Sequence, residues 1–198
     1  ADMKNLASKY DAMMKNVANM AMGPLPDDVA QALRELAAAY PDVLTFDEKR
    51  GMLRFASDFT FDLGSDALNS SAQSTLVTLA KILNSSNARG FEVDVVGHTD
   101  NVPISNAGTR AKHPTNVHLS VHRAISVRDA LVKDGVSADR FEVAGFGEYR
   151  PVVSNPAHGG SRENRRVEIF LRPMTTAVAV SETPTKAAGA KDIDEPMK

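Results

Sequence analysis

Segments with the apolar period of a strand alternate along residues 43–174 with segments that have the longer period of a helix. Strand patterns occupy residues 44–46, 52–61, 91–97, 141–144 and 167–171. Helical patterns follow Asn69-Ser70 and Ser120, whose side chains can cap a helix N-terminus, and Gly135 predicts where the second helix ends. The interleaving predicts an α/β (α+β) fold, namely a β-α-β-α-β-β sandwich with helices packed on one face of a mixed sheet, preceded by N-terminal helices.

The two ends of the chain have different patterns. Residues 1–22 have the apolar spacing of an amphipathic helix, and a second helix is predicted over residues 27–39, after the break at Gly23-Pro24-Leu25-Pro26. The first helix either packs on the domain or forms a short coiled coil in a homodimer. Residues 175–198 lack periodicity and are expected to be a disordered tail. We therefore expect a helical linker or dimerisation segment over residues 1–42 and a folded domain over residues 43–174.

Charge and composition exclude several classes of partner and site. The formal net charge is −2 over 198 residues, so no nucleic-acid partner is expected. Cysteine is absent, which excludes disulfides, thiolate metal sites and a lipid-bearing cysteine within this chain. Because no run of about 18 apolar residues occurs, we expect a membrane anchor only in sequence upstream of Ala1.

Asp100 and Arg123 form the first candidate binding site. Asp100 ends the turn Gly97-His98-Thr99-Asp100 after a strand, and Arg123 comes three residues after the expected cap at Ser120. A helix N-terminus and a guanidinium fork both favour a carboxylate, whereas an aspartate complements an ammonium. The pair therefore suits a zwitterion, or else it forms a structural salt bridge between loop and helix, and spacing alone leaves both open.

The run Asn164-Arg165-Arg166 opens the last strand. Arg165 shares the parity of the apolar residues of that strand and is predicted to point toward the helices, whereas Arg166 points to the other face with Glu168. An inward arginine is costly unless it is paired. Arg165 therefore either pairs with an acid such as Asp62 or meets a ligand carboxylate.

The histidines are the candidates for metal binding or catalysis. Four of them fall in one polar stretch, at His98, His113, His118 and His122. The last two have the i, i+4 spacing of a helical metal site, but the expected cap at Ser120 places His118 outside the helix. The chain also has neither a Gly-x-Ser-x-Gly elbow nor a cysteine nucleophile. We therefore expect no catalytic residues, no metal ligands and no cofactor.

Several motifs together resemble the OmpA C-terminal domain family. They lie in the right order within residues 53–173 and comprise Phe59-x-Phe61-Asp62, Val96-Gly97-His98-Thr99-Asp100-Asn101, Asn116-x-x-Leu119-Ser120-x-x-Arg123-Ala124, Gly145-x-Gly147-Glu148 and Asn164-Arg165-Arg166-Val167-Glu168-Ile169. The resemblance implies non-covalent binding of peptidoglycan, with Asp100 holding the ammonium and Arg123 the carboxylate of diaminopimelate in the stem peptide. It also implies that Asn116, Asp62 and Arg165 line the pocket.

The loop between Asp100 and Asn116 departs from this pattern. It is longer than in OmpA proper, and its two ends are similar to the flagellar stator subunit MotB. A long loop at the pocket is expected to act as a lid or to change ligand choice.

The resemblance implies a periplasmic protein that anchors an outer-membrane or other envelope component to the wall without catalysis. Two roles stay open, a linker between envelope and wall and the wall-binding domain of a MotB-like stator. Two other classes are alternatives: a metal-dependent wall hydrolase that uses the histidines, and an interaction domain with a vestigial pocket.

Overall fold

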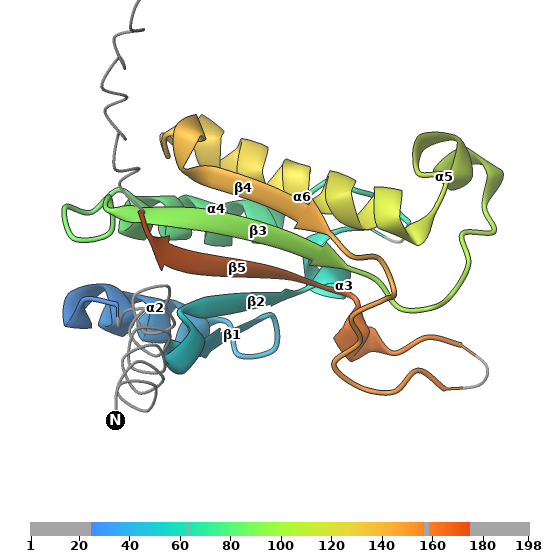
Figure 1. Ribbon diagram of the computed structural model, residues 1–198, viewed down its shortest axis with the longest axis horizontal. Coiled ribbons are helices and arrows are strands. Elements are labelled where there is room, and N and C mark those ends of the chain that lie inside the picture. The colour runs from blue at the N-terminus through green and yellow to red at the C-terminus, as the bar shows by residue number, and fades with distance from the viewer. Residues whose placement is uncertain (1–24, 63, 157–158, 175–198) are drawn as a thin grey trace, which may run out of the picture.

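The computed structural model describes residues 25–62, 64–156 and 159–174 (Figure 1). Labelled as in Figure 1, its elements are α2 (Asp27–Ala39), β1 (Leu44–Asp47), β2 (Met52–Ala56), α3 (Ser57–Thr60), α4 (Ser70–Leu83), β3 (Phe91–His98), α5 (Ala107–Lys112), α6 (Asn116–Lys133), β4 (Phe141–Gly145) and β5 (Arg166–Pro173). The helix expected over residues 1–22 and the tail expected over 175–198 lie outside the described residues. Within the described residues, no helix has the length and apolarity needed to cross a membrane.

The five strands form one mixed sheet in the order β1-β2-β5-β3-β4. β3 pairs with β4 in parallel, and the other three pairings are antiparallel. Helices α2, α4 and α6 lie on the same side of this sheet (Figure 1), and α5 stands apart beyond the N-terminal end of α6. The predicted α/β sandwich with a mixed sheet is therefore confirmed.

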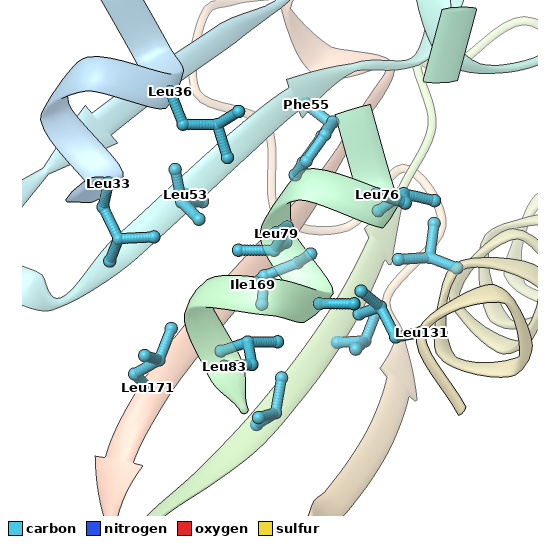
Figure 2. Close-up of a cluster of buried hydrophobic side chains, with 14 of the residues drawn as sticks. Leu33, Leu36, Leu53, Phe55, Leu76, Leu79, Leu83, Leu131, Ile169 and Leu171 are labelled. Carbon is cyan, nitrogen blue, oxygen red and sulfur yellow. The ribbon is translucent and has the colours of Figure 1, made fainter. Parts of the chain in front are cut away.

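A single apolar core lies between the sheet and the helices (Figure 2). Val93, Val95, Val167 and Ile169, from the inner face of the sheet, are fully buried. Helices α2, α4 and α6 cover them with buried side chains that include Leu33, Leu36, Leu76, Leu79, Leu83 and Leu131. Burial of these faces from water is the main favourable contribution to folding. Because α2 packs into this core, the expected domain boundary at residue 43 stays a prediction.

Two paired glycines let α6 approach the sheet closely. Gly97 and Gly145 are partners in the parallel β3–β4 ladder. A Cβ atom at Gly97 would lie 1.9 Å from the carbonyl oxygen of Ser120, and one at Gly145 would lie 2.5 Å from the backbone nitrogen of Val121. Any larger residue at either position would push the helix away. The close approach places the second turn of α6 beside the end of β3.

The strand predicted over residues 52–61 is wrong beyond Ala56. The chain turns there into α3, where the hydroxyl of Thr60 donates to the carbonyl of Ala56 at 2.9 Å. Phe61 is nevertheless buried, at 3% exposed, and forms an isolated bridge with Leu68. A helical turn places Phe61 in the core as well as an extended strand would, so the apolar spacing alone does not distinguish a helical turn from a strand.

The expected cap of the third long helix is also wrong. Helix α6 begins at Asn116, and the hydroxyl of Thr115 accepts a hydrogen bond from the backbone of His118. Ser120 lies inside the helix and is fully buried; its hydroxyl donates to the carbonyl of Val117 at 2.7 Å and accepts from Gly147 N at 3.0 Å. The preceding loop contains the short helix α5, which the polar sequence did not predict.

Candidate ligand-binding site

A cavity of about 420 Å³ opens where β3 ends and β5 begins. Four of the five predicted site residues line it, namely Asp100, Asn116, Arg123 and Arg165. The rest of the wall comes mainly from the long loop and α5, through Val102, Pro103, Ile104, Ser105, Asn106 and Thr109. The loop is therefore part of the pocket wall, at the position where a lid was expected.

Arg123 lies about two turns into α6, not in its first turn. The sequence predicted that Arg123 lies in the first turn, where the helix N-terminus would help to bind a carboxylate, and this prediction is wrong. The side chain is 5% exposed, its Nε donates to the carbonyl of Ser65 at 2.9 Å, and its guanidinium carbon stands 5.1 Å from the ring centre of Phe61. The two terminal nitrogens make no hydrogen bond to any residue that the structure describes.

The electrostatic setting of Arg123 is unusual for an arginine. Burial lowers its pKa to about 10, and the positive charge of Arg165 adds to this, while Asp58, Asp100 and Asp66 act in the opposite direction. The charged form persists at neutral pH but is poorly solvated. A ligand carboxylate would supply the hydrogen bonds that the terminal nitrogens lack.

Asp100 is 5% exposed and already has partners on both carboxylate oxygens. Oδ1 accepts from the backbone of Val102 at 3.1 Å, and Oδ2 accepts from Nη1 of Arg165 at 2.6 Å. Gly160 packs so closely that a Cβ atom there would lie 2.0 Å from Oδ2. A carboxylate has about four acceptor positions, so two stay available on Asp100 for a ligand ammonium.

Arg165 joins two acids, and one of them was not predicted. Its Nε and Nη2 form a bidentate pair with Asp58, at 2.8 and 2.6 Å, while Nη1 reaches Asp100. These hydrogen bonds raise the pKa of Arg165 and lower that of Asp58. The expected partner Asp62 is exposed and is not among the residues that line the cavity. Asp58 could have been found only by placing residues 57–60 in a helical turn.

Asn116 braces the long loop. Its amide nitrogen lies within hydrogen-bonding distance of the carbonyls of Asp100 and Val102, at 3.3 and 3.1 Å, and of the carboxylate of Glu148 at 2.6 Å. With its donors occupied by protein atoms, Asn116 positions the pocket wall, and only its side-chain oxygen is left for a ligand.

The predicted polar stretch of histidines separates into distinct sites. His98 is buried beneath the sheet end, 3.5 Å from Glu168, and burial lowers its pKa. His118 contacts its own helix cap, Thr115, at 2.8 Å. His113 lies against His122, with 2.7 Å between their Nδ1 atoms. The i, i+4 pair therefore does lie on one helix, contrary to the expectation from Ser120, but its two members have different partners.

A family model described as the OmpA family matches residues 60–165, which is more than half of the chain. The chain belongs to the OmpA family. The expected family is thus confirmed, and the cavity described above lies within the matched part of this OmpA-family chain. Asp58 falls just before the matched segment.

Among curated relatives, the chain is 37% identical over 123 residues to "Probable lipoprotein YiaD" of Escherichia coli, covering 62% of this chain and 52% of the relative. It is 40% identical over 84 residues to Motility protein B of Bacillus subtilis, covering 42% and 31%. The chain therefore spans about half of the first relative and a third of the second.

Solved structures show the same fold. A MotB-like protein from Desulfovibrio vulgaris superimposes with a TM-score of 0.63 at 26% identity, over 74% of this chain and 93% of that chain. The cell wall anchor of the T6SS from Pseudomonas aeruginosa gives a TM-score of 0.62 at 28% identity, over 72% and 97%. Both matches cover nearly the whole of the solved domain.

Proposed function

We propose that this OmpA-family domain binds peptidoglycan non-covalently and anchors an envelope component to the wall. The observation that carries the proposal is the buried guanidinium of Arg123, whose terminal nitrogens face a cavity with Asp100 and Arg165 on its wall. A structural neighbour described as the cell wall anchor of the T6SS supports the same assignment.

The charges of the cavity fit a zwitterion. Arg123 offers a guanidinium fork to a carboxylate, and Asp100 retains acceptor positions for an ammonium. Arg165 is saturated by Asp58 and Asp100, so its role is to fix the Asp100 carboxylate in place. Diaminopimelate carries an ammonium and a carboxylate on one carbon at the end of its side chain, whereas lysine carries the ammonium alone. The extra carboxylate would meet Arg123.

The decisive experiment compares two muropeptides that differ only in diaminopimelate or lysine at the third position of the stem. We expect calorimetric titration to show saturable binding of the diaminopimelate form by the wild type. Arg123→Ala should lose at least about 30-fold in affinity for this form while changing affinity for the lysine form little, because a bidentate charged pair contributes about 2 kcal/mol or more.

Arg123→Lys is the matched control for this titration. It keeps the charge but not the fork, and we expect about a tenfold loss in affinity. Equal affinity of wild type and Arg123→Ala for the diaminopimelate form would refute the assignment of the carboxylate site.

Anchoring requires no turnover, so the wall should survive incubation with the protein. Sacculi mixed with the domain, with and without added zinc, are expected to release no soluble muropeptides while the protein co-sediments with them. Release of soluble fragments would contradict simple anchoring and would favour the alternative that the protein is a wall hydrolase. A single weak site is sufficient for anchoring because the wall is a repeating polymer and several copies act together.

Two roles fit this binding activity, and a relative supports each of them. The resemblance to a lipoprotein favours a linker between envelope and wall, and the resemblance to motility protein B, together with the long loop, favours a stator subunit. Sequence upstream of Ala1 distinguishes the two: a lipid-bearing cysteine indicates the first, and a membrane-spanning helix with an intramembrane acid indicates the second.

A further inference from the structure

Next to the cavity, three potential metal ligands come together from three different segments. Asp66 lies in the loop before α4, His113 ends α5, and His122 lies on α6. Each residue offers one ligand atom, and these atoms all lie within 4.8 Å of one another. His113 is 2% exposed, and Asp66 and His122 are half-buried.

The contact between the two imidazoles is close. Their Nδ1 atoms are 2.7 Å apart, so one nitrogen must carry a proton and the other must accept it. Asp66 Oδ1 lies 3.7 Å from Nε2 of His113, which is too long for a good hydrogen bond. Two imidazoles and a carboxylate thus converge without completing a hydrogen-bonded network.

We propose that Asp66, His113 and His122 form a site for a divalent cation of the zinc class. Zinc binds histidine and carboxylate ligands at about 2.0 to 2.2 Å, which places tetrahedral ligand atoms roughly 3.3 Å apart. The side chains reach this arrangement if the imidazoles separate slightly and Asp66 moves inward. The proton shared by the Nδ1 atoms then moves to an Nε2 atom, and water fills the fourth position.

The contact between the two imidazoles favours ligation. Because one Nδ1 atom must accept the proton that the other carries, at least one imidazole already presents a nitrogen lone pair to a metal. Lys112 and Arg123 are the sequence neighbours of His113 and His122. Their positive charges repel a cation, so we expect micromolar rather than picomolar affinity.

The site would tie the pocket wall to the rest of the domain. His113 closes α5, whose segment supplies Ile104, Asn106 and Thr109 to the cavity. Asp66 follows Ser65, the carbonyl of which accepts from Arg123. A bound cation would hold the long loop against both segments, and this holds whether or not the cavity binds peptidoglycan.

Zinc titration of the full chain, free of any affinity tag, tests the proposal. We expect one equivalent of Zn²⁺ to bind at pH 7.5, with a rise in melting temperature. His122→Ala and Asp66→Asn should weaken binding by at least about 100-fold and 10-fold respectively, because loss of even an outer-shell partner of a metal ligand typically costs about 10- to 100-fold in affinity. His118→Ala is the matched control, one turn earlier on the same helix, and should bind zinc like the wild type.

Circular dichroism of the metal-free variants is the control for folding. Asp66 is half-buried, so Asp66→Asn removes a ligand without disturbing the core. Absence of saturable zinc binding by the wild type at zinc concentrations well above the expected micromolar dissociation constant would overturn the proposal. Equal loss in His118→Ala and His122→Ala would overturn it as well, because binding would then be a general property of histidines on α6.

Discussion

Arg123 and Arg140 are buried to the same extent, each 5% exposed, at opposite ends of β3. Arg140 donates three hydrogen bonds to backbone carbonyls, to Leu83 and Phe91 at 2.8 Å and to Ala88 at 2.7 Å. Arg123 donates one, to Ser65, and its terminal nitrogens face the cavity. Buried polar groups are normally satisfied, so the contrast separates an arginine whose guanidinium is used by the fold from one whose terminal nitrogens have no partner among the described residues, as the proposed carboxylate site requires.

A third arginine shows the other way of satisfying a buried guanidinium. Arg166 is 4% exposed and pairs with Glu168 at 2.9 Å on the face of the sheet away from the helices, as the parity of the strand predicted. Arg54 approaches the same carboxylate at 3.2 Å. Arg140 is thus paired with carbonyls, Arg166 mainly with a carboxylate, and Arg123 with a single carbonyl at the wall of a cavity, and each environment predicts a different response to substitution.

Replacing Arg140 with Met should have the largest effect. Methionine fills much of the volume but removes three hydrogen bonds, and although the carbonyl of Ala88 still accepts from the backbone of Phe91, we expect a loss of about 2 kcal/mol in total. We expect urea unfolding to show this loss in the free energy of unfolding, while affinity for the diaminopimelate muropeptide stays within about twofold, since the cavity lies at the other end of β3. A stability loss below about 1 kcal/mol would mean that these carbonyls find water instead.

Glu168→Gln should lower the free energy of unfolding by about 2 kcal/mol at neutral pH, because it removes a charged hydrogen-bond acceptor of Arg166, and should also change the response to acid. Burial raises the pKa of Glu168, but contacts with His98 and Arg166 outweigh it and bring the pKa to about 2, below the ordinary value of 4.5. Because the folded pKa is depressed, the stabilisation is complete above about pH 4.5 and is lost as pH falls toward 2.

The measurement for Glu168 is urea unfolding at pH 7, 4 and 3, in wild type and variant. The wild type should lose stability across this range and approach the variant, whose amide does not titrate. If the free energies of unfolding of the two proteins fall in parallel, another carboxylate dominates the acid response and the pair between Arg166 and Glu168 contributes little to it.

The contrast among the arginines could be predicted only in part from sequence. Apolar periodicity reports local burial, so it predicted helices α2 and α4, the strands except the end of the second, and the shared face of Arg166 and Glu168 away from the core. It carries no information on partners distant in the chain. Asp58 pairs with Arg165 across 107 positions, and Arg140 reaches carbonyls about 50 positions away.

Errors in the local predictions have a common cause. Thr115 and Ser120 are both acceptable caps, and the choice depends on Ser120 being buried against Gly147, which is a tertiary contact. Asp58 was not predicted as a partner of Arg165, because the strand pattern expected over residues 52–61 gives no sign of the helical turn in which Asp58 lies. Asp100 and Arg123 nevertheless both line the cavity, as the sequence predicted, because both residues lie near the end of β3.

Arg123→Met should have the smallest effect on stability, although it is the same substitution at the same burial as Arg140→Met. Burial lowers the pKa of both arginines, that of Arg123 to about 10, but only Arg140 has its terminal nitrogens paired with carbonyls. Removing that charge offsets the loss of the single hydrogen bond to Ser65 and of the contact with Phe61. We expect the free energy of unfolding to stay the same or to rise by up to about 1 kcal/mol, whereas muropeptide binding is lost. Urea unfolding of the two methionine variants side by side measures the difference, and a loss above about 2 kcal/mol for Arg123→Met would mean that the fold, and not a ligand, requires this guanidinium.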